Sequence, residues 1–248
     1  MSMIPETTVA RKYSYTPIAN GEYEARIVRV VGLGVHNQDP WIDPVTKAAT
    51  PKAPAFRMDL AFELIGVDAQ GVDSDGKPLD PKPSCQFKSY TVNPRAKNSG
   101  MLNLVKMIDP SIQALKGDLS WYKDMLLGQP VNLVVGSYVN KNGETKNTIK
   151  SITPIPTKYR DGVAAARCDL IYFDPYVETD ANVEAYSNLF PFQRNMLTMA
   201  NDAKNIPLAG REVVKGSDTE QKEPTSTVPT IDKEPDVTGN AGDDSSPF

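Results

Sequence analysis

Cysteine and histidine are scarce in this chain, which has two cysteines and one histidine among its 248 residues. A structural zinc site takes four such ligands, so these residues by themselves are too few to build one. Cys85 and Cys168 lie far apart in the sequence, and we expect both to be reduced, buried thiols of a cytosolic protein. His36 lies in a proline-rich loop without a neighbouring serine or cysteine that could serve as its nucleophile.

Long apolar runs are also absent. No stretch approaches the roughly 20 consecutive apolar residues of a membrane span, and residues 1–6 lack the basic and apolar regions of a secretory signal. No Gly-x-x-x-x-Gly-Lys-Ser/Thr loop for phosphate binding occurs. We therefore expect a cytoplasmic protein with no cofactor, no metal, no membrane contact and no enzymatic activity.

The net charge of -4 is unevenly distributed along the chain. Residues 216–248 contain eight acidic and two basic side chains, a net of -6, whereas residues 1–215 contain 25 basic and 23 acidic ones, a net of +2. The acidic segment has four prolines and no aromatic residue before Phe248, so it buries too little apolar surface to offset the entropy of ordering. The pattern predicts a folded domain over residues 1–215 and a disordered acidic tail over residues 216–248.

Five segments of the domain have the composition of β-strands. Ala55 to Ile65 alternates, with Phe56, Met58 and Leu60 on one face and Arg57 on the other, which is typical of a half-buried strand. The remaining strands are expected at residues 22–35, where Gly32 and Gly34 indicate a bend or bulge, and at 84–92, 130–140 and 145–153. An Asn-Gly turn at Asn142-Gly143 predicts a hairpin between the last two.

Two helical segments interrupt this series. Residues 100–108 have helical spacing and end at Asp109-Pro110, and a second short helix is expected at residues 121–127. Five strands with a helical insertion between the third and the fourth is the order of an OB-fold barrel, so the fold class is predicted to be mainly β. Residues 155–215, with a helix near 192–202, are expected to form an α/loop extension that packs on the barrel.

Three segments carry a resemblance to a known family. Tyr15 to Gly34 resembles the opening of phage-encoded single-stranded DNA-binding proteins of the OB-fold type, and Met125 to Val131 resembles their helix-to-strand step. The ending Asp243-Asp244-Ser245-Ser246-Pro247-Phe248 is similar to the acidic Pro-Phe tip of bacterial single-stranded DNA-binding proteins. The resemblance implies sequence-independent binding of single-stranded DNA in phage DNA replication, recombination and repair, in the cytoplasm of the host cell.

Binding of this kind needs cations for the phosphates and exposed aromatic rings for the bases. An OB-fold uses the face of its second and third strands and the loops between strands 1–2 and 4–5. We expect Phe87 to point inward, which turns Lys88 and Tyr90 outward. The predicted DNA-binding residues in these regions are Arg26, Trp41, Lys47, Lys52, Arg57, Lys88, Tyr90, Arg95, Lys97, Tyr138, Lys141, Lys146 and Lys150.

Each of these residues also has a plain structural alternative. Tyr90 and Tyr138 are as well explained by core packing as by stacking on bases. Arg57 and Lys88 are equally suited to pair with acids on neighbouring strands, and a lysine at a hairpin tip, such as Lys141, is usually just solvated.

The tail predicts a second contact. Phe248 combines an aromatic ring with a carboxylate, Pro247 restricts its conformations, and Asp243 and Asp244 add charge that attracts a basic partner. We expect these four residues to bind replication or recombination proteins, or to fold back and compete with DNA. The alternative is a tail that only increases solubility.

Two other functions remain open from the sequence. A structural or adaptor protein of a replication or virion complex would use the tail and the extension without binding DNA. A metal-dependent nuclease would need Asp59 and Glu63 together, but four residues along a strand separate them by roughly 13 Å. The oligomeric state, monomer or homodimer, is left undetermined.

Overall fold

Five antiparallel strands form the main sheet of the protein, whose computed structural model describes residues 14–213. They are β2 (Gly21–His36), β5 (Ala55–Ala69), β7 (Lys82–Val92), β8 (Pro130–Val139) and β9 (Thr145–Pro154), in the spatial order β7-β5-β2-β8-β9. The strands at the two ends of this order, β7 and β9, also contact each other, so the sheet curls on itself. All five strands were predicted from sequence, and the mainly β class is confirmed.

The central strand β2 bends sharply along its length. Its register with β5 shifts between Ile27 and Arg29 and again between Gly32 and Val35. The second shift confirms the irregularity predicted at Gly32 and Gly34, and the first was not predicted. Gly34 has a φ of 83°, and a Cβ on Gly32 would lie 2.6 Å from Cδ of Pro175. Glycine is therefore required at Gly34 by the backbone conformation and at Gly32 by the close approach of another segment.

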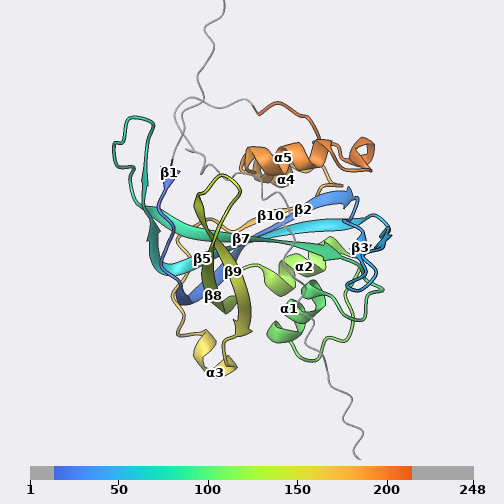
Figure 1. Cartoon of the computed structure of the whole chain (residues 1–248), viewed down its shortest axis with the longest axis horizontal. Helices are drawn as coiled ribbons and strands as arrows, with labels where there is room; N and C mark the ends of the chain where they lie inside the picture. The colour runs from blue at the N-terminus through green and yellow to red at the C-terminus, as the bar shows by residue number, and fades with distance from the viewer. Residues whose placement is uncertain (1–13, 214–248) are drawn as a thin grey trace, which may run out of the picture.

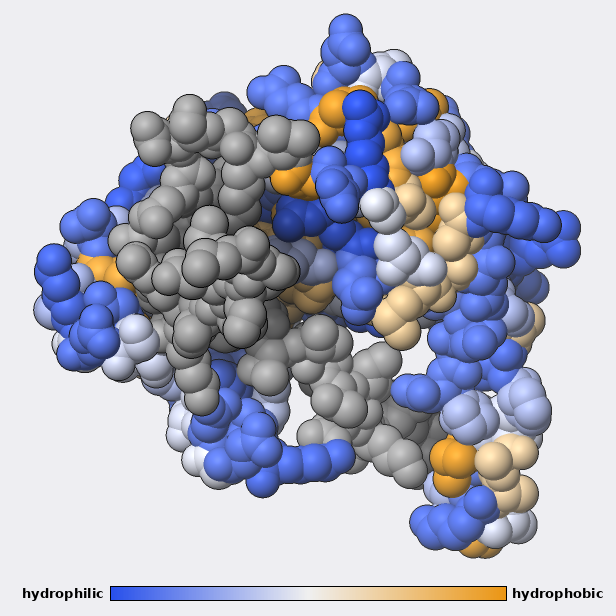
Figure 2. Space-filling model, turned by 90° about the horizontal axis from the view of Figure 1, so that it is seen from above, coloured by the Kyte–Doolittle hydropathy of each residue, from blue (hydrophilic) through white to orange (hydrophobic). Residues whose placement is uncertain are grey.

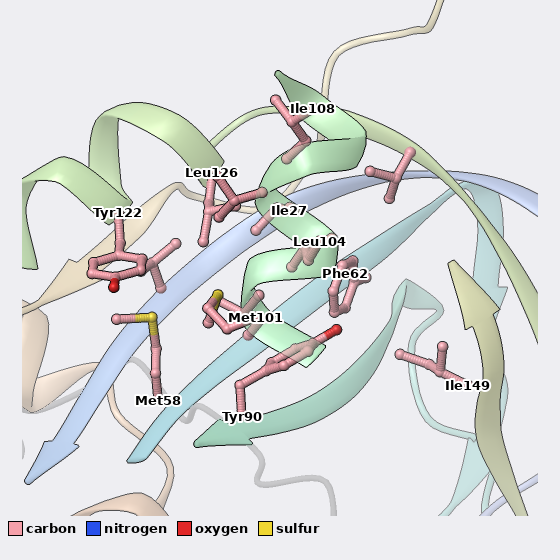
Figure 3. Close-up of a cluster of buried hydrophobic side chains, with 14 of the residues drawn as sticks. Ile27, Met58, Phe62, Tyr90, Met101, Leu104, Ile108, Tyr122, Leu126 and Ile149 are labelled. Atoms are coloured by element: carbon pink, nitrogen blue, oxygen red, sulfur yellow. The ribbon is translucent and has the colours of Figure 1, made fainter. Parts of the chain in front are cut away.

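Two helices cover the concave side of the curled sheet (Figure 1). They are α1 (Gly100–Ile108), whose N-cap Ser99 accepts a hydrogen bond from the backbone N–H of Leu102, and α2 (Leu119–Leu126). Both lie between the third and fourth strands of the main sheet, as predicted. Their apolar faces meet the inward side chains of the strands in one core, in which Phe62, Met101, Leu104, Tyr122 and Leu126 are fully buried (Figure 3).

The predicted orientation of β7 is wrong. Tyr90 and Val92 belong to the core beneath α1, and Tyr90 is only 7% exposed, so burial raises the pKa of its phenol. Phe87 lies on the opposite face, where its ring meets Phe190 edge-on at 5.3 Å. The error arose because both faces of this strand are covered, so an apolar residue on either side is compatible with burial.

The extension forms a second layer on the outer face of the sheet (Figure 1). Its strand β10 (Ile171–Phe173) runs parallel to β2 and pairs with residues 29–31 of that strand. The same edge of β2 pairs with β8 at residues 21–26. Val31 and Leu33 of β2 join Phe173, Tyr186 and Leu197 in a separate buried cluster. The helical elements of this outer layer are α4 (Asp180–Ser187), α5 (Pro191–Thr198) and η1 (Ala203–Asn205). The first helix of the extension, α3 (Thr157–Arg160), lies apart from them (Figure 1), and its Arg160 donates to the backbone oxygen of Ile108 at the end of α1.

The view from above, onto this layer, shows apolar and hydrophilic side chains interleaved (Figure 2). The helix expected at residues 192–202 is present as α5, which begins one residue earlier and ends four residues earlier. Small paired strands complete the fold: β1 (Ser14–Tyr15) with β6 (Gly71–Val72), and β3 (Trp41–Ile42) with β4 (Ala49–Thr50).

Because the extension shares β2 with the main sheet, we expect the two layers to unfold together. Leu197→Ala, at a fully buried position of the extension, should lower the free energy of unfolding by about 2–5 kcal/mol. Urea denaturation followed by circular dichroism and by tryptophan fluorescence should give one coincident transition. Val45→Ala, at a residue that is 86% exposed, is the control and should change stability by less than about 0.5 kcal/mol. Two separated transitions would show that the extension is an independent domain.

Candidate nucleic-acid interface

Two polar loops leave the main sheet at the same end. Loop 37–54 connects β2 to β5, and loop 93–99 follows β7. The register pairs His36 with Ala55 and Phe56 with Val92, so both ends of loop 37–54 and the start of loop 93–99 lie side by side. The topology thereby brings together five of the predicted residues: Trp41, Lys47, Lys52, Arg95 and Lys97.

The first loop folds into a small hairpin, the β3–β4 arm (residues 41–50). Trp41 pairs with Thr50 across the arm, and the Asp43 carboxylate accepts hydrogen bonds from the backbone N–H groups of Val45 and Thr46. These backbone hydrogen bonds hold the pKa of Asp43 below its usual value. Lys47 closes the turn in the left-handed region, with a φ of 58°. The arm holds the Trp41 side chain out from the core, with 45% of its surface exposed.

Loop 93–99 contributes the cations Arg95 and Lys97. The Asn93 side chain accepts a hydrogen bond from the backbone N–H of Arg95 at 3.0 Å, which shapes the turn after β7. Both basic side chains are exposed. They are free to move toward a phosphate, because within residues 14–213 neither forms an ion pair.

A shallow groove of about 410 Å³ lies at this end of the sheet. Phe56 and Tyr176 line it, with ring centroids 6.1 Å apart, together with Val92 and Lys116. The Tyr176 hydroxyl donates to the Asp202 carboxylate at 2.6 Å, and burial followed by Asp202 raises the pKa of the phenol. Two acids, Asp118 and Asp174, also line the groove, so it is apolar at its rings and mixed in charge at its rim.

Tyr176 and Lys116 were not predicted as site residues. Tyr176 belongs to the extension, and no local pattern places it beside Phe56, which is 120 positions earlier in the chain. The sequence indicated Tyr176 as a site residue only weakly, as an aromatic residue among polar neighbours. In the structure its side chain is 40% exposed.

The hairpin of β8 and β9 carries a second group of predicted residues. Tyr138, 41% exposed, lies directly opposite Lys146, which forms an ion pair with Glu144 at 3.2 Å. A Cβ on Gly136 would lie 2.7–2.9 Å from carbons of Lys150, so the stem of this lysine crosses the hairpin at the glycine. Lys141 is exposed at the turn. One face thus combines an exposed ring with lysines on either side.

These two groups lie at opposite ends of β2. The β8–β9 hairpin extends beyond Gly21, which pairs with Val135, whereas the β3–β4 arm follows His36. A strand of 16 residues has a contour of about 50 Å. The predicted residues therefore form two separate patches rather than one continuous surface.

Four predicted residues are engaged within the fold instead. The Arg26 guanidinium donates to the backbone oxygens of Gly128, Val163 and Ala164 at 2.6–2.7 Å, which ties the extension to β2. Tyr90 is in the core, where it offers no free face for stacking, and the Lys88 ammonium lies 6.0 Å from the centre of its ring.

Arg57, the fourth, is half-buried. Its Nη2 donates to Ser89 on the neighbouring strand β7 at 2.9 Å, and its Nε lies 3.8 Å from the carboxylate of Asp59, an acid on its own strand rather than on a neighbouring one.

The two carboxylates of the nuclease alternative are both used structurally. Asp59 is buried and accepts a hydrogen bond from Ser89, and Glu63 is buried and accepts backbone N–H groups of Arg167 and Cys168. Within residues 14–213, no cluster of three or more histidine, cysteine or acidic side chains is placed to hold a metal ion.

The described residues carry 22 basic and 22 acidic side chains, so any electrostatic attraction depends on local clusters rather than on net charge. None of the helices among them is long and apolar enough to cross a membrane. The predicted partner-binding residues Asp243, Asp244, Pro247 and Phe248 lie outside the described part of the chain.

Comparison of the chain with protein-family models, with curated proteins and with solved structures finds no match. Arguments about its function therefore depend on its own residues.

Asp59 is a buried carboxyl group, only 4% exposed, and this has a consequence for stability. Burial raises its pKa above 3.8, against the opposing effects of Ser89 and Arg57. A raised pKa in the folded state means that ionisation of Asp59 lowers the stability of the fold once the pH exceeds the pKa of this residue in the unfolded chain.

Asp59→Asn should therefore stabilise the protein at pH 7, and the gain in stability should shrink to zero below pH 3.8. Chemical denaturation of both proteins between pH 3 and pH 8 measures this difference. A variant that is less stable than the parent at pH 7 would mean that the ion pair with Arg57 outweighs the cost of burial.

Proposed function

We propose that this chain is a non-enzymatic, sequence-independent single-stranded DNA-binding protein of the OB-fold type, acting in phage DNA replication, recombination and repair. The strand order β7-β5-β2-β8-β9, with helices between the third and fourth strands and contact between β7 and β9, is compatible with an OB-fold. The acidic C-terminal tip, in this proposal, recruits replication or recombination proteins.

The observation that carries the proposal is the placement of two exposed rings. Trp41 lies on the arm that connects the first two strands of the sheet, and Tyr138 lies at the end of β8 next to the turn into β9. Each has cations near it in the chain or across the strand. Both project from hairpins, where a large aromatic side chain adds little to the core. An aromatic face stacks on any base, with about 1–3 kcal/mol for each, and this accounts for binding without sequence preference.

The groove at the arm is the better anchor of the two patches. It offers the rings of Phe56 and Tyr176 beside Lys116, and the exposed side chains of Arg95 and Lys97 extend from the neighbouring loop. A base inserted against these rings would place its phosphates near the two cations. The hairpin with Tyr138 then serves as a second contact for a longer strand.

The outer face of β5 and β7 is not part of this proposed site. Phe87 on that face is covered by Phe190 and Phe192, whose rings are stacked at 5.8 Å. The DNA path proposed for this chain therefore follows the loops and the end groove rather than the middle of the strands.

The two tryptophans of the chain allow a direct test of contact at the arm. Trp121→Phe leaves Trp41 as the only tryptophan, and Trp41→Phe leaves Trp121, whose ring packs edge-on against Tyr122 at 4.9 Å next to the core. Oligo-dT should strongly quench the emission of Trp41 and have much less effect on Trp121. In a binding titration, Trp41→Ala should weaken affinity by roughly 5- to 150-fold, corresponding to one lost stacking contact.

The outcome that would contradict this proposal is equally direct. If the unaltered protein fails to bind oligo-dT at low salt, the chain is not a DNA-binding protein, and a structural or adaptor role through the tail and the extension is favoured. If it binds but Trp41 emission is unchanged, the contact lies elsewhere on the molecule.

Charge removal tests the phosphate contacts. Arg95→Ala with Lys97→Ala should lower affinity for oligo-dT and reduce the slope of log affinity against log salt by about 1.4, or 0.7 for each lost contact. Lys77→Ala with Lys82→Ala is the matched control, because these exposed lysines lie at the other end of the β5–β7 pair. Fluorescence anisotropy at several NaCl concentrations measures both pairs. Equal losses in the two pairs would indicate a general charge effect without a local site.

A further inference from the structure

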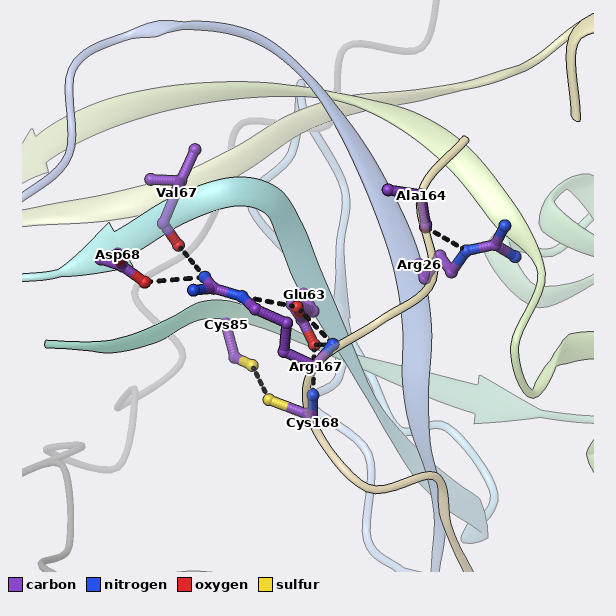
Figure 4. A network of polar contacts seen from close by, with 8 residues as sticks. All are labelled: Arg26, Glu63, Val67, Asp68, Cys85, Ala164, Arg167 and Cys168. Atoms are coloured by element: carbon purple, nitrogen blue, oxygen red, sulfur yellow. Dashed lines mark hydrogen bonds and ion pairs between the residues drawn. The ribbon is translucent and has the colours of Figure 1, made fainter. Parts of the chain in front are cut away.

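The two cysteines of the chain lie next to each other in the fold. Cys85 is on β7 and Cys168 is in the segment that leads into β10, 83 positions later. Their sulfur atoms are 3.7 Å apart (Figure 4), and both side chains are partly exposed. The sequence predicted two separate buried thiols, so this proximity is a product of the tertiary structure.

A buried carboxylate holds this arrangement in place. Glu63 of β5 lies directly opposite Cys85 in the strand register and is only 1% exposed. Its oxygens accept the backbone N–H of Cys168 at 2.7 Å and that of Arg167 at 2.9–3.0 Å. The Arg167 guanidinium in turn binds Asp68 at 2.7 Å. The backbone at Cys168 is therefore fixed against the sheet, with its sulfur beside that of Cys85 (Figure 4).

The surroundings make the two thiols unequal. The hydrogen bond from Cys168, aided by the charges of Arg29 and Arg167, lowers the pKa of the Cys85 thiol despite burial and the nearby Glu63. The same hydrogen bond, with burial, raises the pKa of Cys168. Cys85 is thus the better nucleophile, and Cys168 is placed to react second.

We infer that Cys85 and Cys168 form an intramolecular disulfide on exposure to a small oxidised disulfide such as oxidised glutathione, and that this bond fastens the extension to the sheet. The Cys85 thiolate attacks one sulfur of glutathione disulfide, forms a mixed disulfide and releases one glutathione thiolate. Cys168 then attacks the Cys85 sulfur, its proton passes to the leaving group, and a second glutathione departs. Two protein thiols and one glutathione disulfide give one protein disulfide and two glutathione thiols.

The geometry allows the bond at low structural cost. The sulfurs must approach by about 1.7 Å to reach a bonded distance of about 2.05 Å. Segment 161–170, which carries Cys168, has no helix or strand of its own, so rotation of the side chain and a small shift of this segment are sufficient. The bond would close a long loop and so reduce the freedom of the unfolded chain.

The consequence falls on the layer that covers the outer face. Segment 161–170 is the point where the extension reaches the outer face of the sheet, and it is held there by Glu63 and by Arg26 through the backbone oxygens of Val163 and Ala164. A covalent bond at Cys168 adds a link that local opening cannot break. The oxidised protein should therefore keep β10 and the helices that follow it docked under conditions in which the reduced protein opens them.

The test treats the full-length protein with oxidised glutathione and follows its mass. We expect a loss of two hydrogen atoms without an added glutathione, and a single cross-linked peptide containing Cys85 and Cys168 after digestion. Cys85→Ser and Cys168→Ser are the paired controls. Each keeps one thiol and should retain glutathione as a stable adduct, with slower modification in Cys85→Ser.

Two physical readouts follow the unaltered protein and need no variant. Oxidation should raise Tm by several degrees and slow hydrogen–deuterium exchange of β10 and of residues 163–170. Accumulated glutathione adducts or cross-linked dimers in place of the internal bond would overturn the inference. So would formation of the bond with an unchanged or lower Tm and unchanged exchange, because the bond would then not fasten the extension.

Discussion

The structure depends on one strand that three others share. β2 pairs with β5 along one edge, and its other edge is divided between β8 at the start and β10 farther on. Two bulges, with Gly32 and Gly34 at the second, bend the strand enough to turn its edge from one partner to the other. Without this bend the main sheet would not curl and the extension would have no strand to join.

Because one edge of β2 pairs with both β8 and β10, both faces of the sheet are covered, and this burial decides where a ligand can bind. α1 and α2 occupy the inner face, while the segment after Val163 occupies the outer face and is held by Arg26, Glu63 and the rings of Phe190 and Phe192. Exposed rings are consequently found on the β3–β4 arm, near the end of β8 and in the extension rather than in the middle of the main sheet. The proposal of DNA binding at the arm, the end groove and the β8–β9 hairpin follows from this geometry.

Much of the framework was predictable because it depends on local periodicity. The alternation around Met58 and Leu60 placed β5 and its inward face, and the Asn142-Gly143 turn placed the last hairpin. The orientation of β7 was not predictable, because Phe87 and Tyr90 are both covered, on opposite faces, and a strand covered on both sides has no polar side to mark it. Of the candidate site, exposed Trp41 and Tyr138 were foreseen, whereas Tyr176 and the pairing of Cys85 with Cys168 were not.

The amino-acid sequence by itself determined the strands and the helical insertion, since these depend on spacing and turn residues. The separation of an acidic tail at residues 216–248 stays a prediction, because it lies outside the described residues. Only the tertiary structure decided which cations remain free. Arg95 and Lys97 stay in solvent, whereas Arg26 donates to backbone oxygens and Arg57 donates to the side chain of Ser89, although all four are equally basic in the sequence. The physical reason is that a guanidinium donates to whichever acceptors the fold brings within reach. Val163, which accepts from Arg26, and Ser89, which accepts from Arg57, lie more than 30 positions away in the sequence, so no local pattern indicates them.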